Sequence, residues 1–288
     1  MHQITPMDIK EIRAKSIVTK SKLPGADYVI NPYVGCQFAC TYCYASFMGR
    51  FVNEPLENWG NYLYVKINAV ELFRSEYKQL KSIDNHPPRL MLSSVTDCYQ
   101  GAEKQYELTR GILAHCNEQQ FSGLISILTK SPLVLRDVDI LKNLPNVEVG
   151  LTVTSTEDKI SRFLEIHAPS AKRRFDTLAK LNEQGIQTYA FIGPLLPHFR
   201  YDAKSLGEFI SALADTGVKA VYVEHMNLKS YILKRVNPQL ADSTPEIQGL
   251  YKQAKLQPHR DALQQMILPL LDKHGLQLKL NEVIYHQA

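Results

Sequence analysis

Residues 31–50 read NPYVGCQFACTYCYASFMGR and hold three of the chain's five cysteines. Cys36, Cys40 and Cys43 have the spacing C-x3-C-x2-C, and aromatic residues surround them. Several thiolates on one short loop are typical ligands of zinc or of an iron–sulfur cluster. A closed zinc site needs a fourth ligand, usually from a second C-x2-C pair, and neither Cys98 nor Cys116 belongs to one. A cluster held by three cysteines keeps an open coordination position, so the loop favours a catalytic cluster, with zinc as the alternative.

The composition of the chain is that of an ordinary globular protein. Its 288 residues are 44% hydrophobic and 22% charged, and no apolar run reaches the length of a membrane-spanning helix. The odd number of cysteines excludes a complete disulfide framework. The polar start MHQITPMDIKEIRAKS lacks the apolar stretch of a signal peptide, so we expect a cytoplasmic protein with no membrane partner. A net charge of +4 permits a polyanionic partner without requiring one.

Strand-like and helix-like segments alternate along most of the chain. Apolar segments with the length of buried strands lie at 27–33, 62–67, 89–95, 123–129, 147–155, 186–197 and 219–225. From the second segment onward they alternate with helical patterns, near 68–82, 103–116, 135–144, 157–165, 170–184 and 205–217. This alternation predicts parallel βαβ units. Because no glycine-rich dinucleotide fingerprint follows the first strand, the pattern favours an α/β fold of the partial (βα)6 TIM-like barrel type over a Rossmann sheet.

The expected organisation has three parts. An N-terminal segment covers 1–27, the barrel covers 28–227, and a short C-terminal extension covers 228–288, with a helix near 259–274 and a strand within 276–284. Asn68 is expected to cap the N-terminus of a helix, and Gly185 to follow the C-terminus of another.

Polar residues follow several of the expected strands at their carboxyl ends. Asp97, Lys130, Ser155 and His198 occupy such positions, as does the cysteine loop itself. In barrels and open parallel sheets the active face lies where these ends emerge. We therefore expect the side chains to converge on the loop.

The motif GCQFACTYCY, set after the first strand of a βα series, resembles the signature of the radical S-adenosylmethionine superfamily. The resemblance implies that Cys36, Cys40 and Cys43 hold a four-iron four-sulfur cluster, whose fourth iron is chelated by the amino and carboxylate groups of S-adenosylmethionine. It further implies that the reduced cluster cleaves this cofactor to a 5′-deoxyadenosyl radical, which takes a hydrogen atom from the substrate. The protein supplies ligation, orientation and exclusion of water.

Further blocks resemble the branch of the superfamily related to spore photoproduct lyase. They are NPYVGCQFACTYCYA, VKINAVEL, SSVTDCYQGAEKQYELTR, LTKSPLVLRD and PLLP, and together they extend over about residues 28–200. That branch is expected to have a phrase close to T-D-P-Y-Q. In this chain Cys98 stands in place of the proline.

Candidate residues for binding S-adenosylmethionine lie at the strand ends and on the cysteine loop. The resemblance gives Tyr42 a backbone contact to the adenine and Thr96 a position facing the cofactor, and the superfamily often contacts the ribose at the place of Thr154 and Ser155. Lys130, or one of Arg173 and Arg174, is suited to the methionine carboxylate. The structural alternatives are ordinary strand-end hydroxyls and solvated basic residues.

Asp97, Cys98, Tyr99 and Gln100 follow a strand end and are the candidates for contact with the substrate. The weak S–H bond of a thiol makes Cys98 a candidate hydrogen-atom donor, although the corresponding cysteine of spore photoproduct lyase aligns nearer Val95. The alternative is a buried structural cysteine. Other residues near strand ends are candidates to line the pocket or to serve as hydrogen-bonded structural groups: His198, Glu224 and His225.

The leading hypothesis is a radical S-adenosylmethionine enzyme resembling spore photoproduct lyase, for which repair of a DNA lesion is one candidate activity. Radical modification of a peptide, a tRNA or a small metabolite is the alternative. Basic residues for a nucleic-acid surface are scattered, as in KSYILKR (229–235). The expected protein partner is a reductase or an electron donor of the flavodoxin or ferredoxin type. A non-catalytic zinc or cluster protein that binds nucleic acid is the rival from another class.

Overall fold

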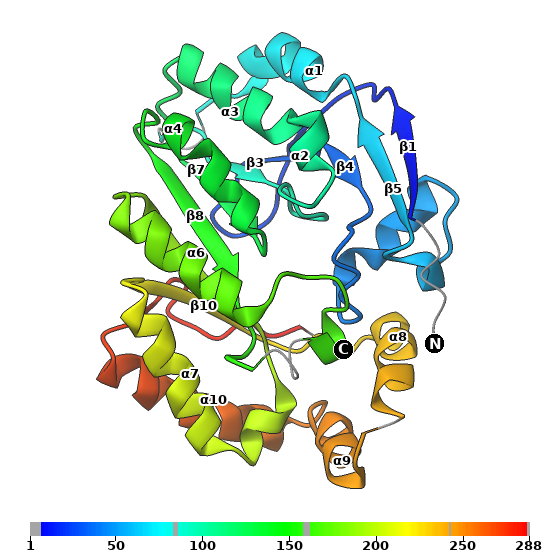
Figure 1. Ribbon diagram of the computed structural model, residues 1–288, viewed down its shortest axis with the longest axis vertical. Helices are drawn as coiled ribbons and strands as arrows, with labels where there is room; N and C mark the ends of the chain where they lie inside the picture. Colours follow the sequence, from blue (N-terminus) through cyan, green and yellow to red (C-terminus); the bar gives the residue numbers. More distant parts are fainter. Residues whose placement is uncertain (1–6, 83–85, 158–161, 242, 287–288) are drawn as a thin grey trace. The chain divides into compact units, whose positions relative to one another are not determined.

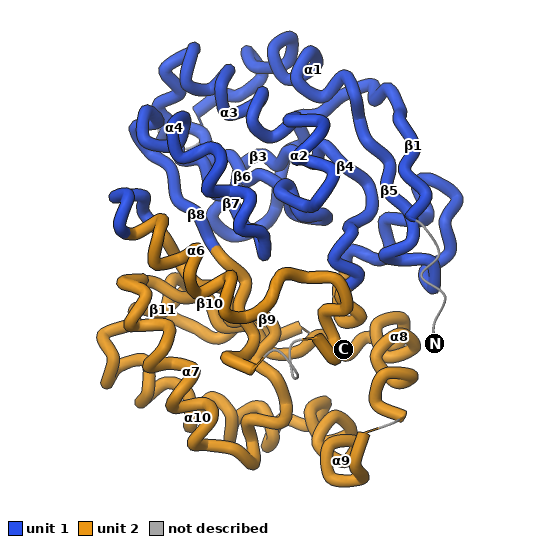
Figure 2. Tube along the Cα trace, viewed as in Figure 1, with its two compact units in different colours: residues 1–39, 45–150, 183–187 blue, residues 40–44, 151–182, 188–288 orange. Residues whose placement is uncertain are grey.

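The computed structural model describes residues 7–82, 86–157, 162–241 and 243–286 (Figure 1). The chain forms two compact units (Figure 2). Unit 1 contains residues 1–39, 45–150 and 183–187, and unit 2 contains residues 40–44, 151–182 and 188–288. The expected division at residues 28 and 228 stays a prediction. The cysteine loop contributes to both units, with Cys36 in unit 1 and Cys40 and Cys43 in unit 2.

Several strands of unit 1 belong to a mostly parallel sheet. Parallel pairing joins β3 (Tyr28–Ile30) to β6 (Leu90–Leu92) and β6 to β7 (Ile125–Thr129). The short β2 (Val18–Lys20) pairs antiparallel with β3 at the edge. Side chains of β7 alternate between buried and half-buried positions, the period-2 pattern of a strand whose one face belongs to the core.

The same sheet continues with strands of unit 2. Between β7 and β9 lies β8 (Val147–Thr152), which begins in unit 1 and ends in unit 2. Parallel pairing joins β9 (Gln187–Leu195) to β10 (Ala220–His225) and β10 to β11 (Gln277–Leu278). On β10 the buried positions are Val221, Val223 and His225, so the histidine lies on the same face as the two valines.

The eight strands have the order β11-β10-β9-β8-β7-β6-β3-β2, and this order does not close on itself among the described residues. The expected α/β class with an open, mostly parallel sheet of barrel type is therefore confirmed. Residues 277–284 also contribute to the sheet, because β11 adds to β10 and Ile284 forms a parallel bridge with Glu224. Of the strand expected within 276–284, only Gln277–Leu278 has regular strand pairing.

The expected strand at 62–67 is present but does not belong to the parallel sheet. It is β5 (Tyr62–Lys66), which pairs parallel with β1 (Asp8–Ile12) and antiparallel with β4 (Tyr33–Val34) in a separate three-stranded sheet. The short β4 leads directly into the cysteine loop. The small sheet therefore supports the start of that loop.

Asn68 stands at the N-cap position of α1 (Ala69–Glu76), but its side chain makes no cap hydrogen bond, so the expected capping role is wrong. Its amide instead accepts from the backbone nitrogen of Ala14 at 2.8 Å and donates to the backbone oxygen of Ala14 at 2.9 Å. These two bonds satisfy both the backbone N–H and the backbone C=O of Ala14, two residues after β1, whereas a cap bond would satisfy a single N–H. The side chain thus fixes the chain that follows β1 to the start of α1.

Helices occupy most of the connections between strands. Unit 1 has α2 (Glu103–Tyr106), α3 (Leu108–Glu118) and α4 (Val138–Leu141), and α1 packs against α3. Unit 2 has α7 (Ala203–Asp215), α8 (Ser230–Leu240), α9 (Pro245–Gln253) and α10 (Gln257–Lys273), and α6 (Ala171–Glu183) lies almost entirely within it. The expected Gly185 follows α6 with φ +74°. Part of the helix expected at 157–165 lies outside the described residues. Within the described part of the chain, no helix combines the length and apolarity needed to span a membrane.

Candidate functional site: the cysteine loop and its supports

The first part of the cysteine loop lies close against the small sheet. Gly35 has φ +97°, and a Cβ at this position would lie 2.5 Å from the backbone oxygen of Tyr62. Ala39 also has a positive φ, 54°, and faces Gly60, where a Cβ would lie 2.4 Å from that of Ala39. Only glycine combines this backbone conformation with such a close approach. The path of residues 35–39 is therefore set by backbone packing.

The segment after β6 holds the same part of the loop through hydrogen bonds. Thr96 donates from its hydroxyl to the backbone oxygen of Gly35 at 2.5 Å, and Gln100 donates to that hydroxyl at 3.0 Å. The other end of the Gln100 amide accepts from the backbone nitrogen of Gln37 at 2.9 Å. Gln37 in turn accepts from the backbone nitrogen of Ala102 at 2.6 Å. Thr96 is thus a support of the residues on either side of Cys36.

Asp97 joins the ends of β6 and β7. Its carboxylate accepts from the Thr129 hydroxyl at 2.6 Å, the Lys130 backbone nitrogen at 2.9 Å and the Tyr99 backbone nitrogen at 2.9 Å. Burial raises the pKa of Asp97, although the three hydrogen bonds and the charge of Lys130 oppose this shift. Asp97 and Lys130 therefore meet after adjacent strands, as expected, but the contact is made by the backbone nitrogen of Lys130.

Cys98 and Tyr99 point into the core of unit 1. Cys98 is 0% exposed, its sulfur lies 4.0 Å from the backbone oxygen of Leu92, and burial raises its thiol pKa well above the usual value. Tyr99 is also fully buried and donates its hydroxyl to Asp137 at 3.0 Å. Neither side chain reaches the surface of the described structure, so contact with a substrate would need a local opening.

The second part of the cysteine loop is held in unit 2 by Glu165. Cys40 forms an antiparallel bridge with Glu165, and the backbone nitrogen of Thr41 donates to the oxygen of Leu164 at 2.8 Å. Tyr42 donates its hydroxyl to the Glu165 carboxylate. Burial and the neighbouring carboxylate raise the pKa of Tyr42, so it stays a neutral donor. Backbone and side-chain contacts together fix residues 40–42.

Arg174 completes this arrangement, whereas Arg173 does not take part. Arg174 pairs with Glu165 at 2.5 Å and donates to the backbone oxygens of Pro169 at 2.9 Å and Thr152 at 3.2 Å. It is almost fully buried, and Arg173, one residue earlier on α6, is exposed. A buried charge needs a partner, and Glu165 provides it. The two candidate arginines therefore have different surroundings.

Helix α8 holds the loop from the C-terminal part of unit 2. Arg235 donates to the backbone oxygens of Thr41 at 3.1 Å and Cys40 at 3.2 Å. One turn earlier, Tyr231 donates to the backbone oxygen of Tyr44 at 3.2 Å. Residues four apart lie on one helix face, so the two side chains act on neighbouring parts of the same segment. Helix α8 thus contributes two side-chain contacts to the cysteine loop.

The hydroxyls after β8 are buried within unit 2. Thr154 donates to the Glu165 carboxylate at 3.5 Å, and Ser155 accepts from the backbone nitrogen of Glu157 at 3.0 Å. Sequence reasoning identified both hydroxyls but missed Glu165 and Arg235, which contact the loop directly. Glu165 had no motif to mark it, because its partners Tyr42 and Arg174 are 123 and 9 positions away in the sequence.

The three loop cysteines fit an iron–sulfur cluster in their chemistry. None is in a disulfide; Cys36 and Cys40 are buried, and Cys43 is half-buried. The chain forms two tight turns at the cysteines. In one the backbone nitrogen of Ala39 donates to the backbone oxygen of Cys36, and in the other the backbone nitrogen of Cys43 donates to the backbone oxygen of Cys40. Among the described residues, no three cysteine, histidine or acidic side chains are arranged as a metal site. Cluster ligation therefore rests on the donor set and its spacing.

Comparison with known proteins identifies the family. Residues 30–210 match the model of the radical SAM superfamily, which is well over half of the chain. The chain belongs to the radical S-adenosylmethionine superfamily and is a radical S-adenosylmethionine enzyme, as the cysteine motif indicated.

The similar proteins place it more closely. An uncharacterized protein of Methanocaldococcus jannaschii is 39% identical over 224 residues, covering 78% of this chain and 80% of its own. One of Mycobacterium tuberculosis is 26% identical over 293 residues, covering 95% and 83%. A mutant of spore photoproduct lyase has a similar fold, with a TM-score of 0.72 at 15% identity, covering 96% of this chain and 82% of that chain. The fold is thus related to the spore photoproduct lyase branch.

Proposed function

We propose that Cys36, Cys40 and Cys43 bind a four-iron four-sulfur cluster with one iron left for S-adenosylmethionine. When bound, the cluster supplies the electron that cleaves S-adenosylmethionine and starts hydrogen-atom abstraction from the substrate. The spacing of the three cysteines within a loop that is held on both sides carries this proposal. The electron would come from a reductase or from a partner of the flavodoxin or ferredoxin type.

The residues around the loop would fix the geometry of the thiolates. Thr96 and Gln100 hold the segment around Cys36, and Glu165 and Arg235 hold the segment from Cys40 onward. Ligands that are positioned before the cluster binds need less reorganisation, and hydrogen-bonded surroundings tune a cluster's reduction potential. These four side chains are the proposed supports of the metal site.

S-adenosylmethionine would be bound by the candidate residues at the strand ends and on α6. Tyr42 would offer its backbone to the adenine, Thr154 and Ser155 would lie near the ribose, and Thr96 and Lys130 would face the methionine moiety. For the carboxylate we favour Arg173 over Arg174, because Glu165 already holds the guanidinium of Arg174. An arginine can bind a carboxylate through two parallel hydrogen bonds.

The proposed substrate is a DNA lesion of the kind that spore photoproduct lyase repairs. Its support is the likeness in fold to that enzyme, which extends to a structure of it complexed with dinucleoside spore photoproduct at a TM-score of 0.69 and 15% identity. Asp97, Cys98 and Tyr99 stay the candidates for substrate contact. Because Cys98 and Tyr99 are fully buried, the role of Cys98 as a hydrogen-atom donor requires a local opening. Modification of a peptide, a tRNA or a small metabolite is the alternative outcome.

The test is anaerobic reconstitution with iron and sulfide, followed by reduction in the presence of S-adenosylmethionine. We expect 5′-deoxyadenosine to form with the native chain and not with a variant in which all three loop cysteines are alanine. A protein that binds only zinc and leaves S-adenosylmethionine intact would overturn the cluster proposal.

The substrate is tested separately with the active enzyme and DNA that contains spore photoproduct. Loss of the lesion is the expected result. If S-adenosylmethionine is cleaved while the lesion persists, the DNA-repair proposal fails and the enzyme class stands. Transfer of deuterium between S-adenosylmethionine and peptide, tRNA or metabolite candidates would then identify the substrate.

A further inference from the structure

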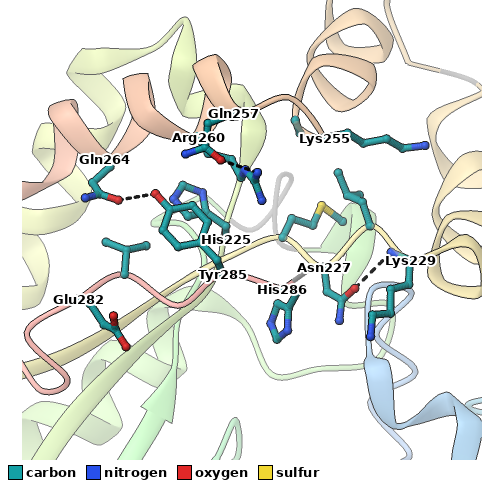
Figure 3. A pocket seen from close by; sticks show the side chains of 14 residues that line it. His225, Asn227, Lys229, Lys255, Gln257, Arg260, Gln264, Glu282, Tyr285 and His286 are labelled. Carbon is teal, nitrogen blue, oxygen red and sulfur yellow. Dashed lines mark hydrogen bonds between the residues drawn. The ribbon is translucent and has the colours of Figure 1, made fainter. Parts of the chain in front are cut away.

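Unit 2 contains a pocket of about 700 Å³ beyond the carboxyl end of β10 (Figure 3). Its walls come from three parts of the unit: the end of β10 with the residues that follow it, the start of α10, and the C-terminal segment around Tyr285. Pockets of this size hold organic molecules of drug or nucleotide dimensions. All of its lining residues lie within unit 2.

The charges that line the pocket are mostly positive. Lys229, Lys255 and Arg260 contribute three cationic side chains, and Glu282 is the acidic residue among the lining residues. Lys255 and Arg260 also flank the N-terminus of α10, whose first turn has no acidic residue and whose N-cap, Leu256, makes no side-chain cap bond. A helix N-terminus favours negative charge. The pocket is therefore built to attract an anion.

Buried nitrogen atoms support this assignment independently of the surface charges. His225 is 3% exposed, yet its Nε2 has no hydrogen-bond partner among the described residues, and the same holds for Nε of Arg260. A buried polar atom without a partner costs free energy, which a ligand can recover. Burial lowers the pKa of His225 to about 4, so its neutral ring can donate one N–H near pH 7.

The pocket also has a planar aromatic wall. Tyr285 stacks on His225 with ring centroids 4.7 Å apart and an interplanar angle of 25°, and the guanidinium of Arg260 lies 5.1 Å from the Tyr285 centroid. Gln264 accepts from the Tyr285 hydroxyl at 2.5 Å, so the ring is held in place, as Figure 3 shows. Met226 and Val283 add buried apolar surface. This wall suits the organic part of a ligand rather than a bare ion.

We propose that this pocket binds a small organic phosphate of about mononucleotide size. The phosphate would be bound by Arg260 and Lys255, and the organic part would lie against Tyr285 and Met226. A doubly charged group matches the surplus of positive charge better than a single carboxylate does. The proposal goes beyond cluster chemistry and does not require the cluster.

The test is calorimetric titration of the full chain with uridine 5′-monophosphate as the probe, with uridine and inorganic phosphate as comparison ligands. We expect uridine 5′-monophosphate to bind at least about tenfold more tightly than either, because charge-assisted hydrogen bonds and the apolar wall both contribute. Equal binding of the nucleotide and the nucleoside would overturn the proposal.

Three variants make the test specific. Arg260→Gln and Lys255→Gln should each weaken binding of uridine 5′-monophosphate about tenfold. The matched control is Lys273→Gln, an exposed lysine in the last turn of the same helix, which should bind as the native chain does. Lys255 is exposed, so its variant tests the proposal even if Arg260→Gln misfolds. Native affinity in Lys255→Gln and in a folded Arg260→Gln would contradict the proposal.

A competition experiment separates this pocket from the cofactor site. S-adenosylmethionine should leave the affinity for uridine 5′-monophosphate unchanged. Displacement of the nucleotide at a one-to-one ratio would assign the pocket to S-adenosylmethionine and overturn the proposal, while the proposed function would stand. Conversely, a chain that binds the phosphate but never cleaves S-adenosylmethionine would retain the pocket and lose the proposed function.

Discussion

The guanidinium of Arg174 and the carboxylate of Glu165 form an ion pair of 2.5 Å in which each side chain is only 1% exposed. The other oxygen of the Glu165 carboxylate accepts a hydrogen bond from the hydroxyl of Tyr42, which lies between Cys40 and Cys43 in the sequence. The pair therefore connects α6 to the cysteine loop. Because both charges are buried, removing one of them leaves the other without compensation.

Replacing Glu165 by glutamine should lower the free energy of unfolding by about 3–5 kcal/mol, because Arg174 would keep a buried, unpaired charge. Urea denaturation measures this loss. The double variant Glu165→Gln/Arg174→Met should recover much of it. The matched control is Lys172→Met, which removes an exposed pair with Asp176 at 2.8 Å and should change stability by less than about 1 kcal/mol. Similar losses for Glu165→Gln and Lys172→Met would contradict a structural role for the buried pair.

Arg235 places a positive charge next to the backbone of Cys40. A cation near a cluster favours its reduced, more negative state, so Arg235→Met should lower the reduction potential by roughly tens of millivolts. A redox titration followed by electron paramagnetic resonance measures the potential. Arg235→Lys should retain most of it, and Lys234→Met, which removes the exposed neighbouring cation, should leave it unchanged. An unchanged potential in Arg235→Met would show that the charge does not act on the cluster.

Each of the three loop cysteines should be needed for cluster binding, whereas the two cysteines outside the loop, Cys98 and Cys116, should not. Cys36→Ala, Cys40→Ala and Cys43→Ala are each expected to lose most of the iron and sulfide taken up on reconstitution, because a cluster with one thiolate fewer is poorly held. The controls are Cys98→Ala and Cys116→Ala, two buried cysteines of unit 1 that should keep full iron content. Iron and sulfide analysis per chain decides between the two groups. Loss of iron in the controls but not in the loop variants would refute the assignment.

The sequence predicted the parallel strands because their apolar runs are local signals, but it could not predict their partners. The segment 62–67 was correctly predicted as a strand, and its placement in the main series was wrong, because β5 pairs with β1 instead. Four of the five residues of β1, DIKEI, are exposed, so no apolar pattern identified it. Strand pairing depends on residues far apart in the sequence, and β1 and β5 are about fifty residues apart.

The same limit applies to the site. The cysteine spacing is a local pattern, and it led to the family. Glu165 and Arg235 contact the loop from distant parts of the chain, and neither belongs to a motif. Asn68 is the opposite case: the sequence has a local capping pattern, but the side chain hydrogen-bonds to a distant residue, Ala14, instead of capping the helix. Tertiary contacts thus decided the roles of polar residues that local patterns left open or misassigned.

Gly35 should tolerate no side chain. Gly35→Ala would combine a positive φ of 97° with a Cβ only 2.5 Å from the Tyr62 backbone oxygen, so we expect a loss of stability of about 3 kcal/mol. The matched control is Gly185→Ala, where φ is +74° but no atom lies within 4 Å of the added Cβ. That variant should cost only the backbone strain of about 1–2 kcal/mol. Equal losses in urea denaturation would mean that the contact with Tyr62 relaxes without cost.

His225 should make the stability of the protein depend on pH. Burial lowers its pKa from 6.5 to about 4 in the folded state. Between these values the unfolded chain binds more protons than the folded chain, so the contribution of His225 is present above pH 6.5 and is lost as the pH falls toward 4. The loss between pH 7 and pH 4.5 should be about 2 kcal/mol for this residue.

The measurement compares the free energy of unfolding in urea at these two pH values for the native chain and for His225→Phe. The variant cannot take up this proton, so its stability should fall less on acidification, by about 2 kcal/mol. His167→Phe, which replaces an exposed histidine, is the control. It should show the same pH dependence as the native chain. If His225→Phe also matches the native chain, the ring of His225 is solvated in the folded state and its buried position in the pocket is wrong.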